Sequence, residues 1–470
     1  MIREIHGVQR TPTLTESTSE SARSRRRATP GSRRSVPGYP PVLVMNPYYS
    51  GLGIARSLHG RGIPVFALTA ERGVPGARSR YFEDVYVVPN GRDEPERLCQ
   101  RLLEIRADHA QRPIIFPTRD FDVLFLDKYR TALARDYLLP QPEGSVALRM
   151  LDKLELATVA TRLNIPTPAT VICGSTQDLE RHIARLRFPV VIKPRFAYEW
   201  RRKGVWDRVG AQKAIVVQSG AELRARYDQL ASVSRDVLLQ EYVSGGDSDI
   251  VVCCCYTDRH GQLLGHFTAR KLRQNPPLIG TGCVVEASEV GPIVAPSVQL
   301  LRAFGYSGLA EIEYKYDEAR DAYYLIEINP RHWDQHELGN LVGTNLTWIA
   351  YQDIIGLPAA KITPSYGHGV KHWIAETELV EGIARNVSLE LAALRASKAS
   401  YRDYLSLFRG TYRELAGWLK AEKVFGILKL RDPIPGFLMF SGLVAKAFGL
   451  FGAMVRRRVR PADNAGEKVH

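Results

Sequence analysis

The sequence has few cysteines, and none of them form a CxxC pair. Of 470 residues only six are cysteines, and three of these are consecutive, Cys253, Cys254 and Cys255, inside an apolar run. This spacing suits no disulfide framework, so a reducing cytoplasm is the simpler expectation. The three consecutive side chains are expected to be small buried hydrophobic groups of a strand rather than a metal site.

The first 38 residues lack both an apolar run and any apolar periodicity. This absence argues against a secretory signal, and the Ser-, Thr-, Arg- and Pro-rich composition predicts a disordered, solvated tail. Residues 1–40 hold eight arginines against three glutamates, and residues 455–470 hold five basic against two acidic residues. These tails therefore carry +8 of the total charge of +14. The remaining chain is only mildly basic, so no nucleic-acid partner is expected.

The length and composition predict a globular chain of two or three domains. Hydrophobic residues make up 45% and charged residues 24% of the sequence, and 470 residues exceed one compact core. We expect a fold of mixed α/β and α+β class, divided into a disordered basic tail (1–38), a parallel-sheet α/β domain (39–148), a mostly antiparallel α+β module (149–375) and a helical C-terminal extension (376–470). Alternating apolar strands and helices in the first of these domains predict the parallel sheet.

The glycine-rich segment 50–53 lacks the third glycine of a dinucleotide-binding fingerprint. Only Gly51 and Gly53 follow the strand predicted at residues 42–45. A tight strand-to-helix turn is therefore expected there, and not NAD binding.

Residues 308–331 are the most informative stretch of the sequence. Two alternating apolar and polar runs flank a polar turn at residues 317–322, which predicts a β-hairpin. A turn centred on Arg320 places Glu313 opposite Glu327 and Glu311 opposite Asn329, with all four side chains on one face. Carboxylates opposed at about 4.5–5.5 Å between Cβ atoms repel each other unless a cation lies between them. Carboxylate and amide oxygens are suited to Mg²⁺.

Several basic residues stand at strand ends upstream of this hairpin. Lys193 ends the apolar strand 188–193 and is followed by Pro194, and a lysine there is suited to phosphate. A glycine-containing loop at residues 203–210 could close over phosphates, and the strand that begins at Lys213 follows it. A basic cluster at residues 269–274 ends another strand. Each of these features alone is weak, because many strands end in lysine.

The order of these segments along residues 40–375 resembles the ATP-grasp superfamily, in its carboxylate–amine ligase type. The most specific part is the string from Glu327 to Arg331, Glu-Ile-Asn-Pro-Arg, with a carboxylate upstream. Residues 116–120, Phe-Pro-Thr-Arg-Asp, also look like the N-terminal domain of these ligases. The resemblance implies a two-lobed module that binds ATP and Mg²⁺, or Mn²⁺ in its place, in the cleft between the lobes.

The resemblance also implies a role for each matching residue. Phosphate contacts fall to Lys153 and Lys193, with Lys213 also near the nucleotide. The adenine would lie at Gln240, Glu241, Tyr242 and Val243, and the ribose near Asp249. Lys271 would contact the γ-phosphate, Arg273 would lie beside the nucleotide, and Arg331 would steady the acylphosphate. Glu313, Glu327 and Asn329 would hold the metal.

The implied reaction activates a carboxylate as an acylphosphate and transfers it to an amine, with release of ADP and phosphate. A carboxylase or carbamoyl-phosphate-synthetase-like enzyme that activates bicarbonate is an alternative. This alternative is disfavoured because the sequence departs from the biotin-carboxylase pattern, which carries a glutamate near the position of Gln335. His332 and His336 have the spacing of two zinc ligands on a helix, but no further ligand is evident. We expect them instead to line the pocket for the amine acceptor. A catalytically weak nucleotide-binding protein at a membrane is a further alternative.

Residues 434–460 combine an apolar run with the arginine-rich segment 456–460. Lys446 and four glycines make a membrane span unfavourable. The pattern fits either an interfacial helix on the inner membrane surface or a helix packed on the protein. The enzyme is therefore expected in the cytoplasm, with peripheral membrane contact as the alternative. The carboxylate, the amine and the oligomeric state are not encoded in any motif.

Overall fold

The computed structural model describes residues 38–443 except 72, 203, 232, 235, 398 and 399. The predicted N-terminal tail up to residue 37 and the arginines after 455 lie outside the described residues. The first sheet is parallel, with strand order β3-β2-β1-β4, as predicted. Its strands are β1 (Val42–Met45), β2 (Val65–Thr69), β3 (Asp84–Val87) and β4 (Ile114–Phe116). Its helices are α1 (Tyr49–Leu58), α2 (Pro95–Ile105), α3 (Asp120–Lys128) and α4 (Arg130–Leu133).

Gly51 and Gly53 lie in the first turns of helix α1, directly after the predicted strand-to-helix turn. A Cβ at Gly51 would stand 2.1 Å from the backbone oxygen of Asn46, and one at Gly53 would stand 2.6 Å from the His336 ring. Both distances are shorter than any real carbon contact. The glycines therefore allow α1 to approach the end of β1 and the segment around His336 closely.

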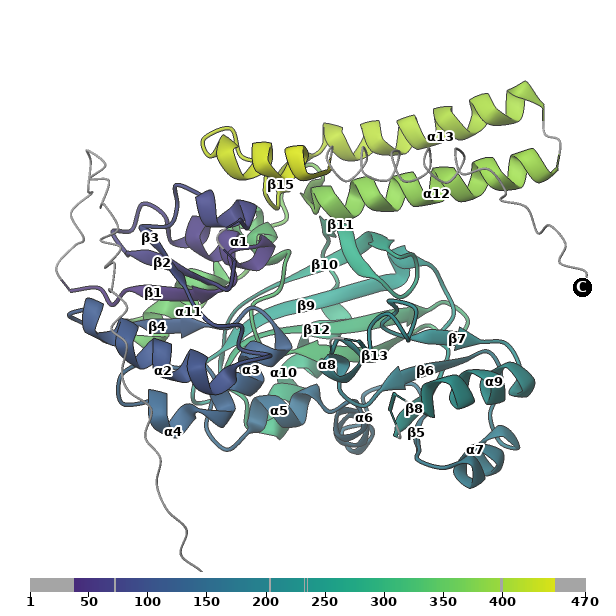
Figure 1. Ribbon diagram of the computed structural model, residues 1–470, viewed down its shortest axis with the longest axis horizontal. Coiled ribbons are helices and arrows are strands. Elements are labelled where there is room, and N and C mark those ends of the chain that lie inside the picture. Colours follow the sequence, from purple (N-terminus) through teal and green to yellow (C-terminus); the bar gives the residue numbers. More distant parts are fainter. Residues whose placement is uncertain are drawn as a thin grey trace, which may run out of the picture.

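A large sheet of seven strands forms the middle of the molecule (Figure 1), with the order β13-β12-β9-β10-β11-β14-β15. All of its pairs are antiparallel except β14 with β15. The strands are β9 (Ile250–Thr257), β10 (Leu263–Asn275), β11 (Thr281–Ala287), β12 (Gly308–Asp317), β13 (Ala322–Asn329), β14 (Lys371–Ile374) and β15 (Glu422–Phe425). The helical elements of this part are α5 (Val146–Leu151), α6 (Lys153–Arg162), α10 (Val294–Phe304), η5 (His336–Val342) and α11 (Leu346–Ile354).

The three consecutive cysteines lie in the interior strand β9 and are free and fully buried, as predicted. Cys254 packs into the core on one side of the sheet, while Cys253 and Cys255 pack into the core on the other. Alternation along the strand separates them, because successive side chains point to opposite faces.

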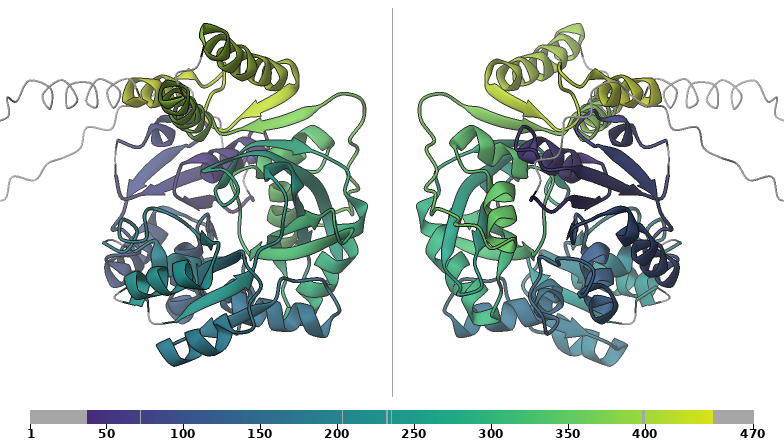
Figure 2. Two further views of the ribbon diagram at one scale, coloured as in Figure 1. Left: turned by 90° about the vertical axis from the view of Figure 1, so that its right-hand side faces the viewer. Right: turned by 90° about the vertical axis from the view of Figure 1, so that its left-hand side faces the viewer.

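A smaller antiparallel sheet with the order β5-β8-β6-β7 forms a separate lobe (Figure 2). Its elements are β5 (Thr170–Cys173), α7 (Thr176–Ile183), β6 (Val190–Pro194), α8 (Ala197–Trp200), β7 (Ile215–Val217), α9 (Gly220–Ala231) and β8 (Val237–Glu241). One face packs against α7 and α9 and has its own core, which contains Val190 and Ile192. Val191 and Lys193, which alternate with them, face the opposite side.

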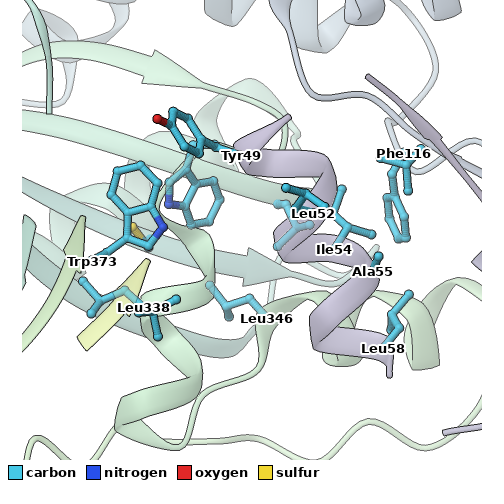
Figure 3. Packing of buried hydrophobic residues seen from close by; sticks show 14 of the residues in the cluster. Tyr49, Leu52, Ile54, Ala55, Leu58, Phe116, Leu338, Leu346 and Trp373 are labelled. Atoms are coloured by element: carbon cyan, nitrogen blue, oxygen red, sulfur yellow. The ribbon is translucent and has the colours of Figure 1, made fainter. Parts of the chain in front are cut away.

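Helix α1 joins the first sheet to the large sheet through one continuous core (Figure 3). Tyr49, Leu52 and Leu58 on α1 are buried in the same cluster as Trp373 of β14 and Leu346 of α11. The ring of Tyr49 meets Trp373 edge to face with centroids 5.5 Å apart. The first sheet is therefore fixed to the large sheet by a shared core, whereas the smaller lobe has a core of its own.

The C-terminal residues form a helical hairpin and then return to the body. Helices α12 (Glu376–Ala396) and α13 (Tyr401–Lys420) project along the top of the molecule in Figure 1. The strand β15, which the sequence did not predict, then extends the large sheet, and residues 433–443 are helical. Among the described residues, no helix is both long and apolar enough to cross a bilayer.

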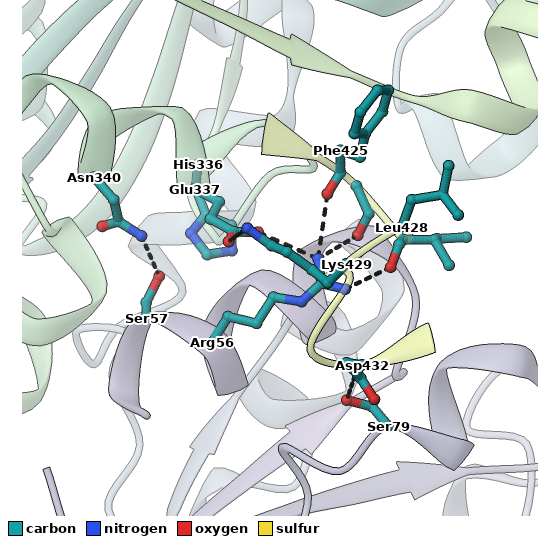
Figure 4. A network of polar contacts seen from close by, with 12 residues as sticks. Arg56, Ser57, Ser79, His336, Glu337, Asn340, Phe425, Leu428, Lys429 and Asp432 are labelled. Atoms are coloured by element: carbon teal, nitrogen blue, oxygen red, sulfur yellow. Dashed lines mark hydrogen bonds and ion pairs between the residues drawn. The ribbon is translucent and has the colours of Figure 1, made fainter. Parts of the chain in front are cut away.

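A polar network attaches the returning chain to the first domain (Figure 4). The Arg56 guanidinium donates to the carbonyl oxygens of Gly426 and Ile427 at 2.8 and 2.7 Å. Ser79 donates to the Asp432 carboxylate at 2.6 Å. Hydrogen bonds with charged partners stabilise more than neutral ones, so these contacts hold the segment after the hairpin in place.

Candidate functional site

A cavity of about 460 Å³ lies where the first domain, the large sheet and the smaller lobe meet. Twelve of the fourteen site residues predicted from sequence line it. They are Lys153, Lys193, Lys213, Gln240, Glu241, Tyr242, Val243, Lys271, Glu313, Glu327, Asn329 and Arg331.

The hairpin β12–β13 pairs its four polar residues as the sequence predicted, with a register shift between Glu313 and Tyr314 on the turn side of them. Glu313 pairs with Glu327, and Glu311 pairs with Asn329. Alternate residues of β12, such as Ile312, are buried in the core behind the hairpin, so the polar side chains of both strands face the cavity.

A lysine neutralises each of the two opposed glutamates. Lys271 of β10 donates a hydrogen bond to Glu313, and Lys153 lies 3.1 Å from Glu327. Lys153 is the first residue of α6, and the Asp152 side chain caps this helix by accepting from the backbone N–H of Leu154 at 3.0 Å. The cap fixes where the helix begins, and thereby the position of Lys153.

The surroundings of the two buried carboxyl groups Glu327 and Glu311 shift their pKa values in opposite directions. Burial opposes the charge on Glu327, but three surrounding lysines outweigh it and hold the pKa of its carboxyl well below the usual range. Burial raises the pKa of Glu311 to about 7, although Lys271 nearby lowers it. Glu311 accepts hydrogen bonds from Asn329, at 3.0 Å, and from Gln335.

Two lysines reach the cavity from the smaller lobe. Lys193 donates to Gln240 at 2.7 Å, and Lys213 donates to Thr281 at 2.5 Å. Burial lowers the pKa of both ammonium groups to about 8. Removal from water disfavours the charged form of each lysine, so a bound anion would stabilise both ammonium groups.

The end of β8 forms another part of the cavity wall. Glu241 accepts from the backbone N–H of Ala169 at 3.3 Å and from Arg320 at 2.8 Å. Tyr242 and Val243 follow it, and Val243 is buried. An exposed strand end with an adjacent apolar side chain offers backbone groups and an apolar surface to a flat ring.

The hairpin supplies oxygen donors that suit a hard divalent cation. The carboxylates of Glu313 and Glu327 and the amide of Asn329 are the oxygen ligands that Mg²⁺ prefers. Their present lysine partners show that the negative charge requires a cation. Within the described part of the chain, no group of three or more His, Cys, Asp or Glu residues could hold a metal ion. Two carboxylates and one amide fit Mg²⁺ that completes its coordination with phosphates and water.

Two predicted nucleotide contacts lie elsewhere. Arg273 does not line the cavity; it donates to Glu414 of α13 at 3.0 Å and so attaches the helical hairpin to β10. Asp249 does not line the cavity either, and accepts from the backbone N–H of Gly246 at 2.7 Å. The sequence pattern indicates which strand a residue occupies, but not which neighbouring element covers its side chain.

His332 and His336 do not line the large cavity, contrary to the preferred interpretation. Both are buried, and burial lowers the pKa of both rings. His336 bonds the Ser50 carbonyl oxygen at 3.0 Å, while His332 contacts Thr347 at 3.1 Å. The cavity is instead lined by Asp334 and Gln335 between them.

Arg331 is held by a residue of the first domain. Its guanidinium donates to the Asp120 carboxylate at 2.7 and 2.6 Å and to the Asn329 side-chain oxygen at 3.0 Å. Burial opposes the charge on Asp120, but Arg331 and Arg201 outweigh it and hold its pKa below the usual value. The segment 116–120, which resembles the N-terminal domain of the ligases, was the signal that could have identified Asp120.

Three further arginines border this end of the cavity and were not predicted as site residues. They are Arg92, Arg119 and Arg201. Nothing in their spacing along the sequence places them together, because they come from a loop of the first domain, the start of α3 and the smaller lobe.

The sequence is similar to those of two amino-acid ligases. It is 23% identical over 408 residues to a D-aspartate ligase of Enterococcus faecium, covering 82% of this chain and 94% of that protein. It is 25% identical over 189 residues to a D-alanine–D-alanine ligase of Pseudomonas entomophila, covering 38% of this chain and 54% of that protein. The family model for the ATP-binding domain of the carbamoyl-phosphate synthase L chain matches residues 283–352.

Solved structures of related architecture cover most of the described chain. One is the biotin carboxylase domain of the Hydrogenobacter thermophilus 2-oxoglutarate carboxylase, in complex with MgADP, ADP and bicarbonate. It has a TM-score of 0.57 and 18% identity, covering 71% of this chain and 73% of that one. The ADP complex of an N5-carboxyaminoimidazole ribonucleotide synthetase has a TM-score of 0.54 and 16% identity, covering 70% and 81%. At these identities the likeness establishes the fold and agrees with the predicted α/β and α+β classes.

Proposed function

We propose a reaction for this chain on the premise that it is an ATP-grasp enzyme of the carboxylate–amine ligase type. In this reaction a substrate carboxylate displaces ADP from the γ-phosphorus of ATP and becomes an acylphosphate. The nitrogen of an amine then attacks the acyl carbon, phosphate leaves, and an amide forms with loss of a proton. The observation that carries the proposal is the pair of opposed glutamates, Glu313 and Glu327, surrounded by lysines in the cavity.

We propose that the positive side chains of the cavity bind and orient the anionic reactants. Lys153, Lys193 and Lys213 would contact the phosphates of ATP. Lys271 would exchange its Glu313 partner for the γ-phosphate, and Arg331, held by Asp120, would steady the acylphosphate. The work is positioning and charge stabilisation, so no protein nucleophile is needed.

The remaining cavity residues are proposed to hold the nucleotide base and the metal. The segment from Gln240 to Val243 would border the adenine. Glu313, Glu327 and Asn329 would hold Mg²⁺, or Mn²⁺ in its place, and the bound ion would offset the negative charge that builds on phosphoryl transfer. No nucleotide contact is proposed for Arg273 or Asp249, because neither side chain lines the cavity.

The relatives indicate the class of donor. Both curated ligases are named for amino acids, one with an acidic and one with an apolar side chain. We therefore propose that the donor carboxylate belongs to an amino acid. The alternatives of bicarbonate activation and of catalytically weak nucleotide binding are not favoured by these ligase relatives.

The test is a carboxylate-dependent assay with hydroxylamine as the amine. The purified chain is mixed with Mg-ATP, hydroxylamine and each amino acid, including both enantiomers. We expect ADP, phosphate and a hydroxamate to accumulate together with the correct donor. Release of AMP and pyrophosphate would show adenylation instead. ADP release that requires bicarbonate and no amino acid would favour the carboxylase reading.

We also propose a cytoplasmic location with peripheral membrane contact through residues 434–460. In the described part of this segment, Ile434, Phe437 and Phe440 are 55%, 73% and 44% exposed. Exposed apolar side chains on one helix, followed in sequence by clustered arginines, are suited to an anionic membrane surface. Residues 444–460 lie outside the described residues.

Flotation on anionic liposomes tests this contact. The full chain is compared with a chain that ends near Asp432 and with a variant in which the three exposed apolar residues are replaced by serine. We expect only the full chain to float, with partial release by salt. Equal behaviour of the full and shortened chains would mean that the segment packs on the protein.

The proposed domain boundaries at 38, 148 and 375 are tested independently by limited proteolysis of the same proteins.

A further inference from the structure

Three arginine guanidinium groups converge at one end of the cavity without a full complement of acidic partners. Arg92 donates to the backbone oxygen of Arg201 at 2.8 Å. The guanidinium carbons of Arg92 and Arg119 lie 4.7 and 5.5 Å from the centre of the Phe121 ring. Phe121 also lines the cavity, so its ring holds both arginines at the cavity edge.

Two of the acids near these arginines already have partners. Arg201 lies 3.9 Å from Asp120, but Asp120 is bonded by Arg331 at 2.7 Å. The Asp122 carboxylate accepts from the backbone N–H groups of Thr118 and Arg119, both at 3.0 Å. Within the described residues, neither Arg92 nor Arg119 forms an ion pair. Burial and the charges of Arg119 and Arg201 lower the pKa of Arg92, although the charges of Asp93 and Asp122 partly oppose this.

Clustered like charges cost free energy unless an anion joins them. The adenine is proposed at β8 of the smaller lobe, whereas Arg92 and Arg119 belong to the first domain, as does Asp120, the partner of Arg331. Arg201 also lies 3.9 Å from Asp120, so an anion bound by these arginines would lie next to the acylphosphate proposed at Arg331. Planar guanidinium groups bind carboxylates through paired hydrogen bonds.

We propose that Arg92, Arg119 and Arg201 form a subsite for a second carboxylate of the donor, so that the donor is an acidic amino acid or a similar dicarboxylate. One carboxylate is activated beside Arg331, and the other is held by the three arginines. This inference rests on the proposed function and adds the class of donor, because an apolar amino acid would leave the arginines without an anion.

The hydroxamate assay discriminates between donors. With Mg-ATP and hydroxylamine, we expect aspartate or glutamate, in at least one enantiomer, to be used at least tenfold better in kcat/KM than alanine or asparagine. Asparagine is the matched control, since it has the shape of aspartate without the second charge. Equal use of alanine or asparagine would overturn the inference while leaving the ligase reaction standing.

Variants test the arginines directly. Arg119→Gln and Arg92→Gln should each raise the KM for the dicarboxylate about tenfold or more, the effect expected from a lost charge-assisted contact. The KM for ATP should stay within about twofold of that of the unaltered enzyme. Arg101→Gln is the matched control, because Arg101 pairs with Glu104 on the surface of α2 outside the cavity. An equal rise in the KM for ATP would assign the arginines to the nucleotide and overturn the inference.

Binding without turnover separates this inference from the proposed reaction. Aspartate and glutamate are titrated into the full chain with Mg-ADP in a calorimeter. Binding that Arg119→Gln weakens at least tenfold supports the subsite even if no hydroxamate forms. Hydroxamate formation from monocarboxylates, unaffected by the variants, would support the reaction and reject the subsite. Melting curves of each variant confirm that the fold is retained.

Discussion

Glu327 on β13 lies 3.1 Å from Lys153 at the start of α6, directly opposite Glu313 across the hairpin. The sequence suggested that removing one of two opposed carboxylates would relieve repulsion. The structure shows that Glu327 is surrounded by cations, which hold its pKa well below the usual range despite its burial. Its charge therefore stabilises the fold as well as serving the proposed metal site.

Glu327→Gln should abolish ADP release and lower the stability of the fold. The substitution leaves Lys153 without its ionic partner, at a cost of about 1–3 kcal/mol near neutral pH. Because the folded-state pKa is depressed, the difference from the unaltered chain should be present above about pH 4.3 and shrink as the pH falls. Chemical denaturation at pH 7 and pH 4 measures it. Near-normal Mg-dependent turnover would rule out the metal assignment.

Lys193→Ala should weaken ATP binding more than it perturbs the fold. A charge-assisted contact to phosphate contributes about 1.5–3 kcal/mol, or roughly tenfold to a hundredfold in affinity. Calorimetric titration with ATP measures this loss, and Lys128→Ala on the exposed surface of α3 is the matched control. An unchanged affinity would mean that Lys193 only supports Gln240.

ATP binding should take up protons near pH 8. Burial holds the pKa of Lys193 and Lys213 at about 8 in the free protein, so both are about half protonated there. Bound phosphates favour the charged form and raise both pKa values, so affinity should fall as the pH rises above 8. Titrations at pH 8 in two buffers of different ionisation enthalpy give the number of protons. Lys213→Ala should reduce the uptake, and proton release would contradict the assignment.

Arg273→Ala should loosen the helical hairpin and leave ATP affinity unchanged. Arg273 pairs with Glu414 at 3.0 Å and does not line the cavity where ATP is proposed to bind. Glu414 is partly exposed, so the pair is worth no more than about 1 kcal/mol. Hydrogen exchange of α13 measures the loosening, and Glu414→Ala should reproduce it. A tenfold loss of ATP affinity would restore the nucleotide role that the sequence suggested.

Most strands and the hairpin β12–β13 could be predicted because their signals are local. The parallel direction of β1 to β4 followed from alternating strands and helices. The predicted pairing of Glu313 with Glu327 is present, but it depends on a register shift between Glu313 and Tyr314 that the turn and the two-residue period did not predict. The burial of Cys253 to Cys255 on alternating faces followed from the same period. In each case the signal is a short repeat of apolar residues along the chain.

The sequence by itself determined the parallel strands of the first domain, the opposed carboxylates and twelve of the residues that line the cavity. Only the tertiary structure decided which side chains share a surface with them. It placed Arg273 against α13, buried His332 and His336 behind the cavity, and brought Arg92, Arg119 and Arg201 together. The physical reason is distance along the chain. A side chain's partner from another domain is chosen by packing of the whole molecule, and no local period encodes that choice.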